Sequence, residues 1–321
     1  MIRRTFVGGA ATLIALPSSA REPALPPTIR IVVPFPAGGA LDNTVRLLAE
    51  GMAMHLNRSV IVDNKPGASG IIGSTDVARS RPDGSTLLYN TGAHTTTPAL
   101  HASLPYNTKT DFTPITLVSD SGGLMLLVAA SSKYDNLKSL IAAAKEQPEV
   151  LSYGSTGVGT TTHLVAALFT KGSQTQFIHV PYRGMNAILP DLKGGRITFT
   201  ILGAALAKQL IDTGQVRALA ISGKQRHRDQ HTVPTFAEQG VDGVDVPAWA
   251  GLFGPGHLSN ETVDTIYQAV LEAARRPAFA DEMSRNGGIN PLPKPGDFKK
   301  YVDSELRRYQ ILLPSLGIKM D

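Results

Sequence analysis

The chain has 321 residues, no cysteine and a formal net charge of +5. Without cysteine, disulfides, thiolate metal ligands and a thiol nucleophile are excluded, and stability must come from burial. The basic residues are scattered and form no block interleaved with aromatic residues, which argues against a nucleic-acid-binding groove.

The N-terminus has the pattern of an export signal. Arg3 and Arg4 precede an apolar run from Phe6 to Leu16, and small residues follow it up to Ala20. This order predicts a signal peptide over residues 1–20, whose apolar run is shorter than the roughly 20 residues that cross a bilayer. Because paired arginines also resemble a twin-arginine signal, the export route stays open between that pathway and general secretion.

Cleavage after Ala20 would leave a weakly basic mature protein. Its formal charge would fall from +5 to +3, because Arg3 and Arg4 leave with the signal and no acidic residue does. We expect a soluble periplasmic protein without a lipid anchor, because no cysteine is available to carry one.

The first part of the mature chain alternates strand and helix. Residues 29–33 form a β-branched run typical of a buried strand, and apolar residues between 41 and 56 recur at helical spacing. Further strands are predicted at 60–62 and 86–89, with a short helix through Val77 between them. This alternation predicts parallel strands covered by helices on both faces.

The middle of the chain repeats this scheme. Strands are predicted at 124–129, 151–153, 177–180, 197–201 and 216–221, and helices at 137–145, 161–169 and 188–192. A chain of this length usually divides into two lobes, so we expect this part to form the second one.

The C-terminal part is predicted to be helical, at 260–276, 278–286 and 298–313. Helices without intervening strands must pack on a sheet that is already built, so we assign them to the first lobe. The expected domains are therefore 28–121 plus 247–321, and 122–246. The extended segments 116–121 and 244–249 would be the two crossings that form a hinge.

A glycine loop, residues 35–39, joins the first strand to the first helix. Glycines let the backbone approach a ligand closely, and the N–H groups that open a helix attract a carboxylate or phosphate. In open α/β sheets ligands usually bind at this edge. Asp42 follows in the first helical turn, where it is either a helix cap or an acceptor for a ligand hydroxyl or amine.

A second loop, residues 154–163, joins a strand to a helix in the other lobe. It carries five hydroxyl side chains, which suit a carboxylate and its bound waters or, alternatively, cap the helix. A third candidate segment, 91–96, follows the strand at 86–89.

Read together, these stretches resemble the solute receptors of tripartite tricarboxylate transporters, also called Bug receptors. The likeness runs in order through nearly the whole mature chain, and it includes segments 31–39 with Asp42 and Arg46, 64–70, 82–88, 104–106, 111–115, 154–163, 179–184, 233–235 and 249–252.

The resemblance implies an α/β, two-lobed type II periplasmic-binding-protein fold, with two mixed sheets flanked by helices and joined by two crossing hinge segments. It implies a small carboxylate ligand held by loop amides and ordered water, no cofactor, and transient contact of a monomer with membrane permease subunits. The ligand-binding residues carried over are Phe35, Ala37, Gly38, Gly39 and Asp42, then Gly92 and Ala93 in the first lobe, and Ser155, Thr156, Gly159 and Thr160 in the second.

One departure concerns the strand at 197–201. Many members of the family have an aspartate just after it, where this chain has Leu202 followed by Gly203, and we predict Leu202 and Gly203 as ligand-binding residues at this position. The loss of that acceptor puts recognition of an amine or hydroxyl on the ligand in doubt.

Two other functions remain open from the sequence. One is a ligand sensor for a membrane signalling protein, and the other is a secreted hydrolase using Ser155, His163 and Asp42. We expect no enzyme, because no Gly-x-Ser-x-Gly elbow is present. The eight histidines form no His-Glu-x-x-His pair, so no metal site is expected either.

Overall fold

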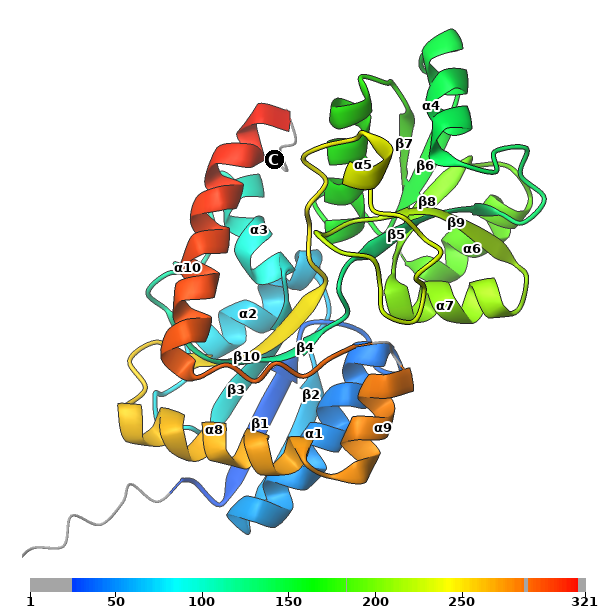
Figure 1. Cartoon of the computed structure of the whole chain (residues 1–321). Helices are drawn as coiled ribbons and strands as arrows, with labels where there is room; N and C mark the ends of the chain where they lie inside the picture. The colour runs from blue at the N-terminus through cyan, green and yellow to red at the C-terminus, as the bar shows by residue number, and fades with distance from the viewer. Residues whose placement is uncertain (1–24, 183, 286–287, 317–321) are drawn as a thin grey trace, which may run out of the picture.

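Two five-stranded sheets, each flanked by helices, form the two lobes of the molecule (Figure 1). The computed structural model describes residues 25–182, 184–285 and 288–316. The predicted export signal at 1–20, the predicted helix end at Asn286 and the last domain residues, 317–321, lie outside the described residues. No described helix is both long and apolar enough to span a bilayer.

The first sheet has the strand order β2-β1-β3-β10-β4. Its strands are β1 (Thr28–Val33), β2 (Ser59–Asn64), β3 (Thr86–Thr91), β4 (Phe112–Asp120) and β10 (Trp249–Pro255). The first three run parallel, as the strand–helix alternation predicts. β10 is antiparallel to both of its neighbours, which makes the sheet mixed.

Helices cover both faces of this sheet: α1 (Ala40–Leu56), α2 (Ile71–Ala78), α3 (Ala93–Leu100), α8 (Asn260–Ala274), α9 (Pro277–Arg285) and α10 (Pro295–Leu312). Ile31 of β1 packs in a core with residues of α1, α8 and α9, whereas Val32 points to the core under α2 and α10. Alternate residues of one strand thus serve opposite faces.

The second sheet has the order β7-β6-β8-β5-β9. Its strands are β5 (Leu124–Ala129), β6 (Ser152–Ser155), β7 (Ile178–Pro181), β8 (Phe199–Gly203) and β9 (Val216–Ile221). Its helices are α4 (Leu137–Glu146), α5 (Thr161–Ser173), α6 (Met185–Lys193) and α7 (Ala204–Asp212). Here β5 is the antiparallel strand, paired with β8 and β9, while β6 is parallel to its neighbours.

The chain crosses between the sheets twice (Figure 1). It passes from β4 to β5 through residues 121–123 and returns after β9 through 222–248. Ser121 N–H donates to the Ala248 carbonyl at 2.8 Å, so the two crossings are hydrogen-bonded to each other. The predicted crossings are corrected in extent, because residues 116–120 belong to β4 and Trp249 already begins β10.

Helix α10 touches both lobes. Its N-terminal half packs on the first sheet through Phe298 and Val302, whereas Tyr309 and the following Leu313 are buried in the core of the second lobe. Lys171 of α5 also donates to the Ser315 carbonyl at 3.0 Å. The sequence pattern does not predict this bridging contact.

The packing of α10 on β10 leaves no room at Gly251. A Cβ atom added there would meet the Phe298 ring and lie 3.1 Å from the Thr116 carbonyl oxygen. We expect Gly251→Ala to lower the free energy of unfolding by about 1–3 kcal/mol, as overpacking does. Urea unfolding measures this. Gly296→Ala, in the first turn of α10 with open space around it, is the matched control and should not destabilise.

Candidate functional site

A cleft of about 310 Å³ lies between the lobes. Its walls come from both sheets and from the two crossings, and they consist of Leu41, Thr44, Thr91, Gly92, Ser119, Ser121, Leu124, Thr161, Gly203, Leu206, residues 247–250, Met283 and Gly288. The volume is at the lower end of the range typical of small-molecule pockets.

Four helices begin at this cleft, two from each lobe. Leu41 belongs to the first turn of α1, Gly92 is the N-cap of α3, Thr161 opens α5 and Gly203 is the N-cap of α7. The first N–H groups of a helix have no intrahelical acceptor and lie at the positive end of its dipole. The cleft therefore concentrates backbone groups that attract an anion.

The caps of these helices differ. In α5 the Thr160 hydroxyl accepts from the His163 N–H at 3.4 Å. The N-caps of α1 and α7, in opposite lobes, are glycines without a side-chain cap, and a Cβ added at Gly39 or Gly203 would meet open space. Among the described lining residues there is no lysine or arginine. An anion here would be held chiefly by backbone and hydroxyl groups.

Asp42 braces the glycine loop. One carboxylate oxygen accepts from the Gly38 N–H and from Arg46 Nε, each at 2.9 Å. The other accepts from Asn64 Nδ2 at 2.9 Å, and the same amide group donates to the Phe35 carbonyl. Burial alone would raise the pKa of Asp42, but these hydrogen bonds and the Arg46 charge hold the pKa below its ordinary value.

This geometry favours neither the helix-cap nor the ligand-acceptor interpretation of Asp42, because its carboxylate accepts from Gly38 ahead of the helix and from two side chains instead. Its side chain is only 4% exposed and is fully used by Gly38, Arg46 and Asn64. The bracing leaves Ala37, Gly38 and Gly39 exposed in front of α1. Phe35 is half-buried and packs against the first-lobe core.

The hydroxyls of the second loop serve the loop itself. Thr156 N–H donates to Thr162 Oγ1 at 3.1 Å, and Thr160 Oγ1 donates to the Gly157 carbonyl at 2.8 Å. Ser155 is completely buried, and its hydroxyl lies 2.7 Å from His179 Nε2. In the described part of this loop, Thr161 alone lines the cleft.

Behind the loop lies a stack of rings. His163 and His179 are parallel within 10°, with centroids 4.0 Å apart, and Tyr153 stacks beside them. Gly159 N–H donates to His163 Nδ1 at 3.0 Å. Burial, and secondarily the neighbouring His179, lower the pKa of His163 to about 4, so this histidine is neutral at physiological pH.

The structure does not assemble the hydrolase constellation. Ser155 contacts His179 rather than His163, and Asp42 is bound to Arg46 and Asn64 in the other lobe. A hydroxyl without exposed surface is also unable to reach a substrate.

The sequence-predicted residues fall into three groups. Gly92 and Gly203 line the cleft. Most others lie in the loops that precede the cleft helices, namely Phe35, Ala37, Gly38, Gly39, Thr156, Gly159 and Thr160, while Asp42 lies in the first turn of α1, Ser155 ends β6 and Ala93 opens α3. Leu202 lies elsewhere: it is 1% exposed, in the core with Met125, because successive strand residues point to opposite faces.

Sequence reasoning missed most of the cleft wall. The missed residues include Leu41, Thr44, Ser119, Ser121, Leu124, Leu206, Met283 and Gly288, together with Pro247 and Ala248. The crossings were predicted as a hinge, and a binding-protein hinge forms the floor of its cleft, so their position was a usable signal.

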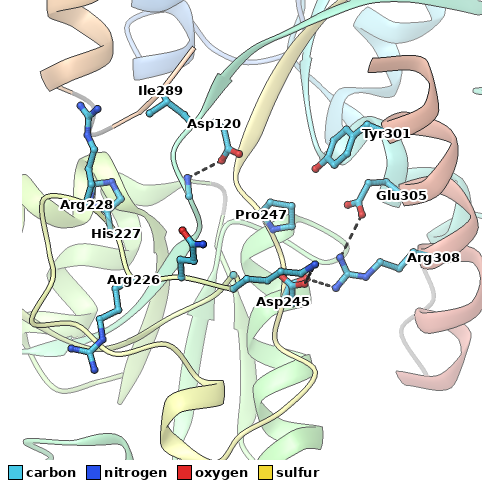
Figure 2. Close-up of a pocket in the computed structure, with 14 residues that line it drawn as sticks. Asp120, Arg226, His227, Arg228, Asp245, Pro247, Ile289, Tyr301, Glu305 and Arg308 are labelled. Atoms are coloured by element: carbon cyan, nitrogen blue, oxygen red, sulfur yellow. Dashed lines mark hydrogen bonds and ion pairs between the residues drawn. The ribbon is translucent and has the colours of Figure 1, made fainter. Parts of the chain in front are cut away.

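A second cavity, of about 430 Å³, borders the same crossing segment at Pro247 (Figure 2). It is strongly charged, but its cations already have acidic partners: Arg308 with Glu305 at 3.4 Å, Arg226 with Glu238 at 2.9 Å and Lys224 with Asp245 at 3.9 Å. An entering carboxylate would have to displace a resident one. The cleft at the helix N-termini is therefore the better anion site.

Comparison with known proteins gives one consistent result. The sequence pattern described as "Tripartite tricarboxylate transporter family receptor" matches residues 44–318. A protein from Pseudomonas sp. (strain P51), "UPF0065 protein in tcbD-tcbE intergenic region", is 33% identical over 283 residues, which cover 88% of this chain and 84% of that protein.

Comparison with solved structures gives the same kind of protein. The periplasmic binding protein BugD has a TM-score of 0.82 at 28% identity, covering 92% of this chain and 99% of its own. Rpa4515 from R. palustris with adipate has a TM-score of 0.82 at 30% identity, and the match covers 91% of this chain and 98% of Rpa4515. MatC from Rhodopseudomonas palustris with bound malate has a TM-score of 0.80 at 27% identity, and the match covers 88% of this chain and 97% of MatC.

The bracing role of Asp42 has a pH signature. A carboxylate whose pKa is lowered by folding stabilises the protein above its unfolded pKa of about 3.9, and the contribution disappears as pH falls through the lower folded pKa. We expect Asp42→Ala to cost about 1–3 kcal/mol at pH 7. The difference from wild type should shrink in acid, as chemical denaturation at several pH values would show. The exposed neighbour Asn43→Ala should change little, and a pH-independent cost for Asp42→Ala would contradict an ionic brace.

Proposed function

This chain belongs to the tripartite tricarboxylate transporter receptor family, and we propose that it binds a small carboxylate in the cleft where α1, α3, α5 and α7 begin. The observation that supports this assignment is the convergence of four helix N-termini, two from each lobe, on one cavity. The adipate and malate held by two similar proteins support an organic acid as ligand.

In this proposal the carboxylate oxygens accept hydrogen bonds from the uncapped N–H groups of α1 and α7. Thr44 and Thr161 add hydroxyl donors from opposite lobes, and ordered water completes the shell. Because the donors belong to both lobes, the ligand binds most tightly when the lobes close about the crossings. Binding thus shifts the population toward the closed form.

The wider assignment follows the family. The chain would be exported by residues 1–20, act in the periplasm as a monomer and deliver its ligand to the membrane permease subunits. Its domains would be 28–121 plus 247–321, and 122–246. No step of this cycle requires chemistry on the ligand, so we propose a receptor and not an enzyme.

Ligand binding should be visible as stabilisation. A carboxylate at 100 times its dissociation constant should add about 2.7 kcal/mol to the free energy of unfolding. Thermal melting against a panel of aliphatic, aromatic, di- and tricarboxylic acids measures this, with the neutral amide of each acid as control. If no acid in the panel raised the melting temperature, the carboxylate proposal would be wrong.

Gly203→Asp tests the position of the anion. The substitution adds a carboxylate in open space at the N-cap of α7, where aspartate is a good cap and should not harm the fold. Its charge would repel the ligand and occupy the same N–H groups, so affinity should fall at least about tenfold. Gly296→Asp, at the start of α10 away from the cleft, is the matched control. Titration calorimetry on both variants would contradict the site if Gly203→Asp bound normally.

A further inference from the structure

We infer that the carboxylate bound in this cleft has an unsubstituted hydrocarbon body, aliphatic or aromatic, rather than hydroxyl or amino substituents. The inference rests on the proposed function and names the class of acid that the cleft selects. It is carried by the side chains that surround the helix N-termini.

Apolar side chains flank the two uncapped helix ends. Leu41 lies in the first turn of α1, and Leu206 lies in the first turn of α7 in the other lobe. Leu206 is 37% exposed although it belongs to a cavity wall. An exposed leucine in a cleft gains stabilisation when a ligand covers it with apolar surface.

The floor of the cleft is apolar as well. Leu124, Trp249 and Met283 line it from the second sheet, the first sheet and α9. All three are almost completely buried, so they form rigid surfaces rather than mobile covers. Between the anion-binding helix ends the ligand would therefore meet mainly hydrocarbon.

The lining offers little to a second polar group. No aspartate, glutamate, asparagine or glutamine is among the described lining residues, so a ligand ammonium group would be left without a counter-charge. Gly203 contributes only backbone groups to the wall.

Several of the hydroxyls in the wall are already engaged. Ser121 Oγ donates to the Ala248 carbonyl at 3.2 Å, Ser119 Oγ lies 3.4 Å from the Tyr89 hydroxyl, and Thr91 Oγ1 accepts from the Ala93 N–H at 3.3 Å. Each of these hydroxyls has already used part of its hydrogen-bonding capacity, which leaves less for a hydroxyl on the ligand. Substitution of the ligand body is therefore disfavoured.

The test compares acids that share a skeleton. Titration calorimetry with the unmodified protein would pair succinate with malate and 3-phenylpropanoate with phenylalanine. We expect the unsubstituted member to bind about 10 to 100 times more tightly in each pair in which binding is detected. Within a series from butanoate to hexanoate, affinity should rise about fourfold per methylene.

The outcomes separate the two proposals. If malate or phenylalanine bound as tightly as its unsubstituted partner, the hydrocarbon-body inference would be overturned and the carboxylate receptor would stand. If none of these acids bound at all, and adipate did not bind either, the proposed function itself would fail.

A variant pair tests the wall directly. Leu206→Asn replaces an exposed leucine by a side chain that can hydrogen-bond a ligand hydroxyl, so the succinate-to-malate preference should fall about tenfold. Val150→Asn, at a residue that is 61% exposed in the same lobe and outside the cleft wall, should leave the preference unchanged. An unchanged preference in Leu206→Asn, with a normal melting temperature, would contradict the inference.

Discussion

The site depends on backbone N–H groups that a helix cannot satisfy within itself. In each sheet the two cleft helices follow two adjacent, parallel strands. β1 and β3 lead into α1 and α3, and β6 and β8 lead into α5 and α7. Parallel neighbours end at the same sheet edge, so their helices begin side by side. When two such edges face each other, the positive N-terminal ends of the helices from both sheets share one cavity.

The antiparallel strand of each sheet makes this arrangement possible. β10 returns from the second lobe between β3 and β4, and β5 leaves β4 to enter the second sheet. Both crossings therefore run along the floor of the cleft, where the Ser121 N–H donates a hydrogen bond to the Ala248 carbonyl. Rotation about these crossings must also involve α10, because Tyr309 and Leu313 are buried in the second-lobe core and Arg308 donates to the Asp245 carbonyl.

The sequence predicted the starts of α1 and α5 but not the helices α3 and α7, and it predicted the cleft walls poorly, for physical reasons. Loops rich in glycine or threonine before helices have a local signal, and the segments around Gly38 and Thr160 lie where strand–helix order places them. Side-chain direction has no such signal. Leu202 and Gly203 are neighbours in the sequence, yet Leu202 packs in the core and Gly203 lines the cleft. Similarly, Leu41 was predicted as part of an apolar core face, and only the meeting of two lobes places it at a cavity.

In the proposed site, different parts of the protein recognise different parts of the ligand. Backbone N–H groups bind the carboxylate, and side chains of the wall contact the rest of the molecule. A helix end presents the same backbone N–H groups whatever its side chains are, unless a new side chain occupies them, as in Gly203→Asp. Asp42 illustrates the division, because its carboxylate holds the loop in shape without entering the cleft. The walls are then free to vary, and in this chain Leu41 and Leu206 place hydrocarbon directly beside the charged end of the site. In the proposed site the backbone amide groups therefore recognise the acid, and the leucines recognise the body of the ligand.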